Sequence, residues 1–113
     1  MALAKTEKDI LREAIAVYGV EAQVLKAAEE LAELIQALMK WCGNPDKAEA
    51  VAEEIADVRI MLDQLEDILR ETNGFSPDAI EEYRRLKIAR LQRRIAARVK
   101  IEPKEVNHAD AGV

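Results

Sequence analysis

The chain has 113 residues, of which 50% are hydrophobic, 35% charged and only 4% aromatic. This length suggests one domain, and a composition rich in Ala, Leu, Glu, Lys and Arg favours an all-α fold. The net charge of −5 is uneven, because residues 1–80 carry 17 acidic and 8 basic side chains, whereas residues 81–113 carry 9 basic and 5 acidic ones. The acidic body argues against nucleic acid as the main partner, since contacts to phosphates dominate such binding.

Cysteine content and hydropathy indicate the cellular compartment in which the protein is expected. Cys42 is the single cysteine, so no disulfide can form within the chain. No stretch approaches the ~20 apolar residues that cross a bilayer, and the N-terminus lacks the apolar run of a signal peptide. We therefore expect a cytoplasmic protein that has neither a membrane nor a nucleic acid as its partner.

Cap and stop signals predict the first two helices. Thr6 opens a capping box, with Asp at the third helical position, for a helix over residues 7–18. Gly19 ends that helix. A second helix is expected over residues 21–41, with Gly43 as its stop.

Two further helices follow from repeated cap-plus-proline signals. The Asn-Pro pair at 44–45 supplies an N-cap and a first helical residue for a long third helix. This helix runs to about residue 72, and the Asn-Gly pair at 73–74 ends it. The Ser-Pro pair at 76–77 does the same for a fourth helix over residues 77–99. We expect residues 101–113 to form a mobile C-terminal tail.

Apolar residues recur at helical spacing in each predicted helix. The second helix has a broad apolar face made of Leu25, Ala28, Leu31, Ala32, Ile35, Leu38 and Met39. The third helix supplies Ile55, Val58, Met61, Leu62, Leu65, Ile68 and Leu69 to the core. A domain of this size buries a modest core. We predict a bundle of four to five antiparallel helices that is completed by homo-oligomerisation.

One acidic pattern occurs twice, on either side of the predicted turn at residues 43–45. Residues 29–33 read EExxE and residues 53–57 read EExxD. Because each helical residue turns by about 100°, each copy places a carboxylate pair at i,i+3 on one face. Two antiparallel helices that face these pairs toward each other could hold a divalent cation between them.

The two pairs are Glu30 with Glu33 and Glu54 with Asp57. On the wheel of the third helix, Asp57 lies between apolar residues and points away from the solvated side. A carboxylate there is costly unless a cation or a proton compensates it, and Mg²⁺ prefers oxygen ligands. On this geometry alone, a metal site and two solvated acidic faces are equally compatible with the pattern.

Basic residues concentrate in the predicted fourth helix. Lys87, Arg90 and Arg94 share one of its faces, at spacings of i,i+3,i+7. One or two of these cations could reach phosphate oxygens near the metal. The alternative is a solvated basic face, which is the expectation for any single residue of the three.

These motifs together resemble the all-α nucleoside triphosphate pyrophosphohydrolases of the MazG-like superfamily, which includes dimeric dUTPases and phosphoribosyl-ATP pyrophosphohydrolases. The resemblance covers roughly residues 17–94. It depends mainly on the acidic motifs at 29–34 and 54–58. Gln23 before the first motif and the LKxxRL sequence at 86–91 add weaker signals.

The resemblance implies one domain over residues 1–100 that cleaves a (d)NTP between its α- and β-phosphates, giving a monophosphate and pyrophosphate. It implies Mg²⁺ as cofactor, with Mn²⁺ able to replace it, and a homodimer or homotetramer. It also implies roles for single residues: Glu30, Glu33, Glu54 and Asp57 as metal ligands, Glu29 as the catalytic residue that orients or deprotonates water, and Gln23, Lys87 and Arg90 as substrate-binding residues.

Three alternatives stay open. The chain could be a specialised dUTP or phosphoribosyl-ATP hydrolase of the same superfamily. It could be a non-catalytic helical interaction module, in which both acidic clusters are only surface. It could also be a nucleotide-binding sensor whose hydrolysis is vestigial. No residue pattern encodes the base or the sugar that is selected.

Overall fold

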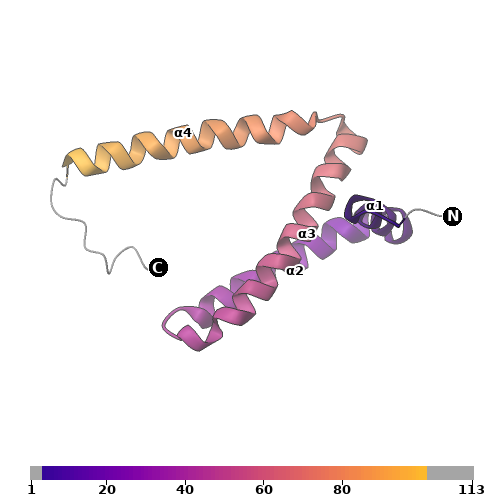
Figure 1. Ribbon diagram of the computed structural model, residues 1–113, viewed down its shortest axis with the longest axis horizontal. Coiled ribbons are helices and arrows are strands. Elements are labelled where there is room, and N and C mark those ends of the chain that lie inside the picture. Colours follow the sequence, from indigo (N-terminus) through magenta and orange to yellow (C-terminus); the bar gives the residue numbers. More distant parts are fainter. Residues whose placement is uncertain (1–3, 102–113) are drawn as a thin grey trace. The chain divides into compact units, whose positions relative to one another are not determined.

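The computed structural model describes residues 4–101, which form four α-helices, one short 3₁₀-helix and no strand. The all-α fold class is therefore confirmed. In chain order the elements are α1 (Glu7–Tyr18), α2 (Val20–Trp41), the 3₁₀-helix η1 (Pro45–Lys47), α3 (Ala48–Asn73) and α4 (Pro77–Ile101), as Figure 1 shows. The predicted tail over residues 101–113 lies outside the described residues, except that α4 ends at residue 101.

The chain divides into two compact units between Phe75 and Ser76. The first unit contains α1, α2, η1 and α3, and the second contains α4. We describe each unit by itself, and the single domain over residues 1–100 stays a prediction.

Helix α1 begins at the capping box that the sequence predicts. The Asp9 N–H donates to Thr6 Oγ1 at 3.1 Å, and the Thr6 N–H donates to the Asp9 carboxylate at 3.1 Å. Helix α1 ends at Gly19, whose φ of 94° and ψ of 154° belong to a region that glycine enters almost alone. The Gly19 N–H donates to the Ile15 carbonyl at 2.9 Å, so one of the last carbonyls of α1 is satisfied where the chain turns into α2.

The connection from α2 to α3 differs from the prediction. Asn44 does not cap α3, because its side-chain Nδ2 donates to the Lys40 carbonyl at 3.0 Å instead. Pro45–Lys47 form η1, and α3 begins only at Ala48. The prediction that Asn44 caps the long third helix was wrong, because Asn44 stands at the N-cap position of η1 without a side-chain cap bond and Lys47 stands at that of α3. Pro45 still begins a helical turn, but a 3₁₀ one.

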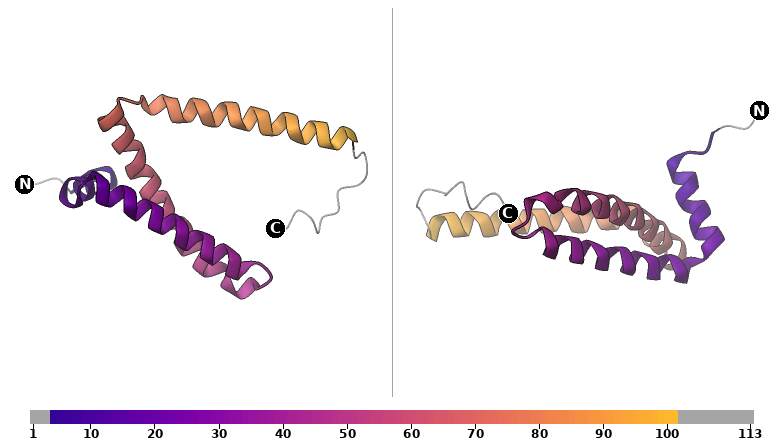
Figure 2. Two further views of the ribbon diagram at one scale, coloured as in Figure 1. Left: turned by 180° about the vertical axis from the view of Figure 1, so that it is seen from behind. Right: turned by 90° about the horizontal axis from the view of Figure 1, so that it is seen from below.

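Helices α2 and α3 lie side by side and run antiparallel (Figures 1 and 2). Gln23 near the start of α2 bonds to Gln64 in the second half of α3, whereas Glu33 of α2 lies near Glu54 in the first half of α3. Helix α1 packs against both helices. The α2–α3 pair therefore provides the frame on which the acidic motifs are placed.

The face of α2 that was predicted to be core is exposed, so that prediction is wrong for the single chain. All seven of its residues, from Leu25 to Met39, are exposed, with Ile35 at 61% and Met39 at 73%. Helix α2 instead packs on α3 through a narrow stripe of Gln23, Ala27, Glu30 and Ala37. This stripe lies roughly 130° around the helix from the centre of the predicted face. The sequence pattern shows where the apolar face of α2 lies, but not which neighbouring element packs on which face.

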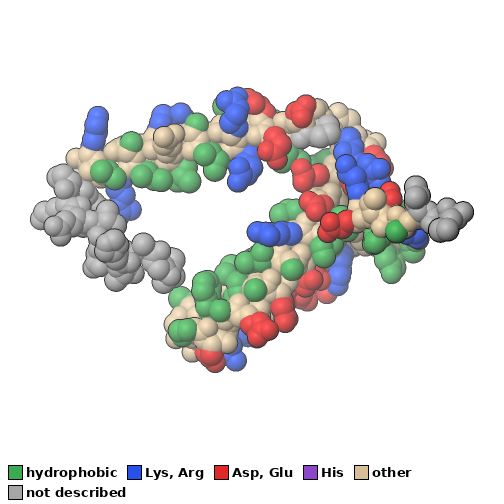
Figure 3. All heavy atoms as spheres, viewed as in Figure 1, with side chains coloured by type: hydrophobic (Ala, Val, Ile, Leu, Met, Phe, Trp, Pro, Cys, Tyr) green, Lys and Arg blue, Asp and Glu red, His purple; other side chains and the backbone are tan. Residues whose placement is uncertain are grey.

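The other predicted core positions are only partly buried. On α3, the buried apolar residues are Val51, Val58, Met61 and Ile68. Ile55, Leu62 and Leu69 are exposed, contrary to the prediction. Along α4, the large apolar residues from Tyr83 to Val99 are at least half exposed, and Figure 3 shows hydrophobic side chains at the surface of both the α2–α3 pair and α4.

Helix α4 begins at its predicted cap, since the Asp78 N–H donates to Ser76 Oγ at 3.2 Å. Among residues 4–101, no helix combines the length and hydropathy that crossing a lipid bilayer requires.

Two glycines give a test of this backbone. A methyl group at Gly19 or Gly74 would meet no atom within 4 Å, so the cost of alanine at either position comes from the backbone alone. Gly74, with φ of 69° and ψ of 19°, is left-handed helical, whereas Gly19 lies outside that region. We expect Gly19→Ala to lower the free energy of unfolding by about 2 kcal/mol and Gly74→Ala by about 1 kcal/mol, measured by urea denaturation. A smaller loss for Gly19→Ala than for Gly74→Ala would contradict this ranking.

Candidate metal centre

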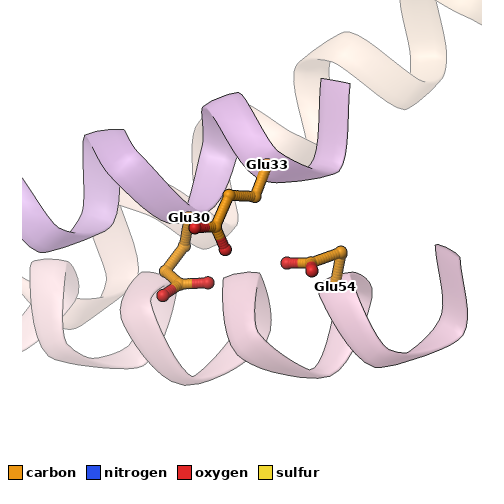
Figure 4. Close-up of side chains that lie close together, drawn as sticks. All are labelled: Glu30, Glu33 and Glu54. Atoms are coloured by element: carbon orange, nitrogen blue, oxygen red, sulfur yellow. The ribbon is translucent and has the colours of Figure 1, made fainter. Parts of the chain in front are cut away.

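Three glutamates from the two acidic motifs meet between α2 and α3. Glu30 and Glu33 of α2 and Glu54 of α3 each offer a carboxylate oxygen, and these oxygens all lie within 4.8 Å of one another. Figure 4 shows the three side chains directed into the space between the two helices. Glu30 is buried, at 7% exposure, and the other two are half-buried. These three residues place the two motifs opposite each other, as the sequence predicts.

Helical spacing explains how the side chains reach this position. Glu30 and Glu33 are three residues apart, so they share a face of α2. On α3, Glu54 lies between the buried residues Val51 and Val58 on the face that meets α2. The local sequence thus places one carboxylate of α3 directly on its packed face.

Lys26 offsets part of the negative charge. Its Nζ lies 3.1 Å from Glu30 Oε1 and 3.6 Å from Glu29 Oε1. The hydrogen bond with Glu30, followed by the charge of Glu29, raises the pKa of Lys26 above its usual value. Sequence reasoning did not single out Lys26, although a lysine four residues before a glutamate on a helix is a recognisable ion-pair spacing.

Two oxygens of the group have no partner. Glu30 Oε2 and Glu54 Oε2 are buried and accept no hydrogen bond among the described residues. A buried charged oxygen without a partner is costly. A cation or a proton between the helices would remove that cost.

The same crowding acts on the third carboxylate. The negative charge of Glu30 raises the pKa of Glu33 above its usual value, and partial burial and the charge of Glu54 add to the effect. Protonation of Glu33 or a cation bound between the helices would relieve this repulsion, and both would act at the same group of carboxylates.

Asp57 lies apart from this group. It follows Glu54 by one helical turn but is exposed, as is Ile60 beside it. The prediction that Asp57 points away from solvent is therefore wrong for the single chain. The physical reason is that no other described element of the first unit covers this edge of α3. Its role as a metal ligand stays a prediction.

The remaining predicted site residues lie in three places. Glu29 is exposed and paired with Lys26, adjacent to the three glutamates in sequence. Gln23 is buried, and its Nε2 donates to Gln64 Oε1 at 2.6 Å, so little of its surface is open to a substrate. Lys87 and Arg90 are exposed on α4, in the second unit, along one surface hollow. The predicted catalytic and substrate-binding roles of these residues are not decided by their positions.

No protein-family model, curated protein or solved structure matches the chain. Membership of the MazG-like superfamily therefore stays a prediction from the motifs.

The raised pKa of Glu33 gives a pH-dependent prediction for the metal-free protein. The folded state holds this proton more tightly than the unfolded state, so stability is lost as pH rises above the ordinary glutamate value of about 4.3 and through the raised pKa in the fold. We expect Glu33→Gln to unfold at a higher temperature than the wild type at pH 7.5 in EDTA, and at nearly the same temperature at pH 4. Thermal unfolding followed by circular dichroism measures the difference.

Glu66→Gln is the matched control, because Glu66 is an exposed glutamate in the second half of α3. We expect this control to change the unfolding temperature little at either pH. An equal gain from Glu66→Gln, or a gain from Glu33→Gln that does not grow with pH, would contradict the role given to carboxylate crowding.

Proposed function

We propose that the chain is a Mg²⁺-dependent nucleoside triphosphate pyrophosphohydrolase, which converts a (d)NTP to a (d)NMP and pyrophosphate. The single observation that carries this proposal is the meeting of Glu30, Glu33 and Glu54, with two buried oxygens that have no hydrogen-bond partner among residues 4–101. The repeated acidic motif and its resemblance to the MazG-like superfamily supply the substrate class and the reaction.

The donor set fits a hard divalent cation. All three side chains offer carboxylate oxygens, which Mg²⁺ and Mn²⁺ prefer. Oxygens bound to one Mg²⁺ at about 2.1 Å lie no more than about 4.2 Å apart. Because the three oxygens lie within 4.8 Å of one another, small rotations of the glutamate side chains would bring them into one coordination shell.

Charge explains why such a site suits a triphosphate. The substrate is a poor electrophile because its own negative charge repels a nucleophile, and a divalent cation supplies the positive charge that offsets it. In this proposal Glu30, Glu33 and Glu54 hold the cation, and Asp57 joins them. Exposed Glu29 accepts a proton from the attacking water.

The other proposed contacts are made to the substrate. Lys87 and Arg90 on α4 bind the outer phosphates, for which the fork of an arginine and the point charge of a lysine are suited. The role of Gln23 in substrate binding is proposed from the family resemblance alone, because its side-chain amide already donates a hydrogen bond to Gln64.

We further propose that homo-oligomerisation completes an antiparallel four-to-five-helix bundle. The support is the exposed apolar face of α2, where Leu25, Ile35 and Met39 are all more than 60% exposed. An apolar face of this kind is unusual for a monomer and marks an interaction site. A second copy that covers the edge of α3 at Ile60 would also bury Asp57 and bring it toward the cation.

The first prediction of the proposal concerns activity. We expect pyrophosphate release from at least one of the common NTPs or dNTPs, dependent on Mg²⁺ or Mn²⁺. Outer-shell substitutions around a metal cost up to about 100-fold, so removing a ligand in Glu33→Gln or Glu54→Gln should cost at least that much. Asp57→Ala should lose activity equally while the fold persists. A pyrophosphate-coupled assay over the full substrate panel measures this.

Glu66→Gln serves again as the control and should retain wild-type turnover. Orthophosphate as the first product would point to a different reaction. If no nucleotide is hydrolysed and Mg²⁺, with or without nucleotide, does not raise the unfolding temperature, the non-catalytic interaction module becomes the better interpretation. Binding of nucleotide without turnover would indicate a sensor.

The second prediction concerns assembly. We expect a homodimer or homotetramer at micromolar concentrations in sedimentation equilibrium. Replacing apolar residues by charge on the exposed face, as in Ile35→Glu with Met39→Glu, should lower the mass toward that of one chain, because the face would no longer lose water on association. A single-chain mass for the wild type at every concentration would contradict the proposed oligomer.

A further inference from the structure

The hydrogen bond between Gln23 and Gln64 joins α2 to α3. The amide nitrogen of Gln23 donates to the amide oxygen of Gln64 at 2.6 Å, across 41 positions in sequence. Both side chains are buried, at 8% and 3% exposure. By comparison, the side-chain hydrogen bonds Lys5–Glu13, Arg70–Asp67 and Arg85–Glu82 join positions that are only three to eight apart. The amide pair is therefore a specific long-range contact in an interface that also contains apolar side chains and the three glutamates of the metal centre.

Such a pair distinguishes one helix register from its neighbours. Contacts of Ala27 with apolar residues of α3 are non-directional, so they tolerate sliding of α2 along α3. A slide of one turn, about 5.4 Å, would separate the two amides and leave both unpaired in the interior. An unpaired buried amide costs about 1–3 kcal/mol, so the hydrogen bond favours the observed register over that alternative.

The helix register that pairs the two amides is the same register that brings the carboxylates of the metal centre together. Glu33 follows Gln23 by ten residues in α2, and Glu54 precedes Gln64 by ten residues in α3. Because both helices rise by 1.5 Å per residue, the amide pair lies about 15 Å along the helices from the carboxylates and in step with them. A slide that breaks the amide pair would also carry Glu30 and Glu33 away from Glu54 by about one turn.

We propose that Gln23 and Gln64 are positioning residues, whose hydrogen bond fixes the register of α2 against α3 and so sets the spacing of the carboxylates that hold the divalent cation. The proposal rests on the proposed function for the cation itself. The register that the amide pair sets is a property of the helices and can be measured without any metal.

The test replaces both amides by a hydrocarbon of similar size, Gln23→Leu with Gln64→Leu. Loss of both partners leaves no unpaired amide, so we expect the stability in urea to stay close to that of the wild type. We expect the affinity for Mn²⁺, measured by titration calorimetry, to fall by roughly tenfold, as for other changes that displace metal ligands indirectly. A loss of metal affinity without a loss of stability separates positioning from a general structural role.

The register is measured directly with nitroxide labels at two exposed, staggered positions, Lys40→Cys and Asp63→Cys, after Cys42→Ser removes the native thiol. Dilution with unlabelled protein restricts the measured distances to one chain. We expect the double leucine variant to shift or broaden the distance distribution by up to about one helical turn, 5.4 Å.

Two further variants complete the experiment. Gln64→Glu keeps an acceptor for the Gln23 amide, so it should restore both the wild-type distance and the Mn²⁺ affinity, and it serves if the double leucine variant does not fold. Gln36→Leu makes the same chemical change at an exposed position of α2 and should alter neither quantity.

The outcomes separate the two proposals. An unchanged distance distribution in the double leucine variant would overturn the register role. A shifted distribution with wild-type Mn²⁺ affinity would overturn the positioning role. If the wild type itself binds no Mn²⁺, the proposed metal centre fails, whereas a shifted distribution would still uphold the register role of the amide pair.

Discussion

Carboxylates of like charge are packed between two antiparallel helices, and their mutual repulsion is the constraint on which the proposed function depends. Glu30, Glu33 and Glu54 converge where α2 meets α3, and Lys26 offsets only part of their charge. A helix contact that served stability alone would not contain three acidic side chains, because each carboxylate raises the cost of ionising the others. A divalent cation would convert this repulsion into attraction, so the crowding that we expect to weaken the metal-free fold is what the proposed activity requires. A local loss of stability of this kind is common at functional sites.

A broad apolar face of α2 stays exposed in the first unit. Helix α2 packs on α3 through a narrow stripe that includes Ala27 and Ala37, and the larger apolar residues of α2 lie outside that stripe. The proposed second copy would cover them and the edge that carries Asp57. Assembly and metal binding are then linked, since the same association that buries the apolar face would complete the ligand set.

The charge asymmetry of the sequence follows the division of the structure. The predicted metal ligands all lie before Phe75, and the predicted phosphate-binding cations lie after Ser76 on α4. In the proposed reaction the predicted metal ligands provide oxygen atoms for the cation, and the predicted cations of α4 bind phosphate oxygens.

The sequence by itself determined the features that depend on neighbours within a few residues. These are the all-α class, the capping box at Thr6, the helix end at Gly74 and the spacing that places Glu30 and Glu33 on one face. Only the tertiary structure decided which face of α2 is buried, that Glu30 is buried while Asp57 is exposed, and that Gln23 bonds to a residue 41 positions away. The reason is that apolar periodicity shows where a face lies but not which neighbour covers it, and the contact of α2 with α3 is made by Gln23, Ala27, Glu30 and Ala37 rather than by the most apolar face of the helix.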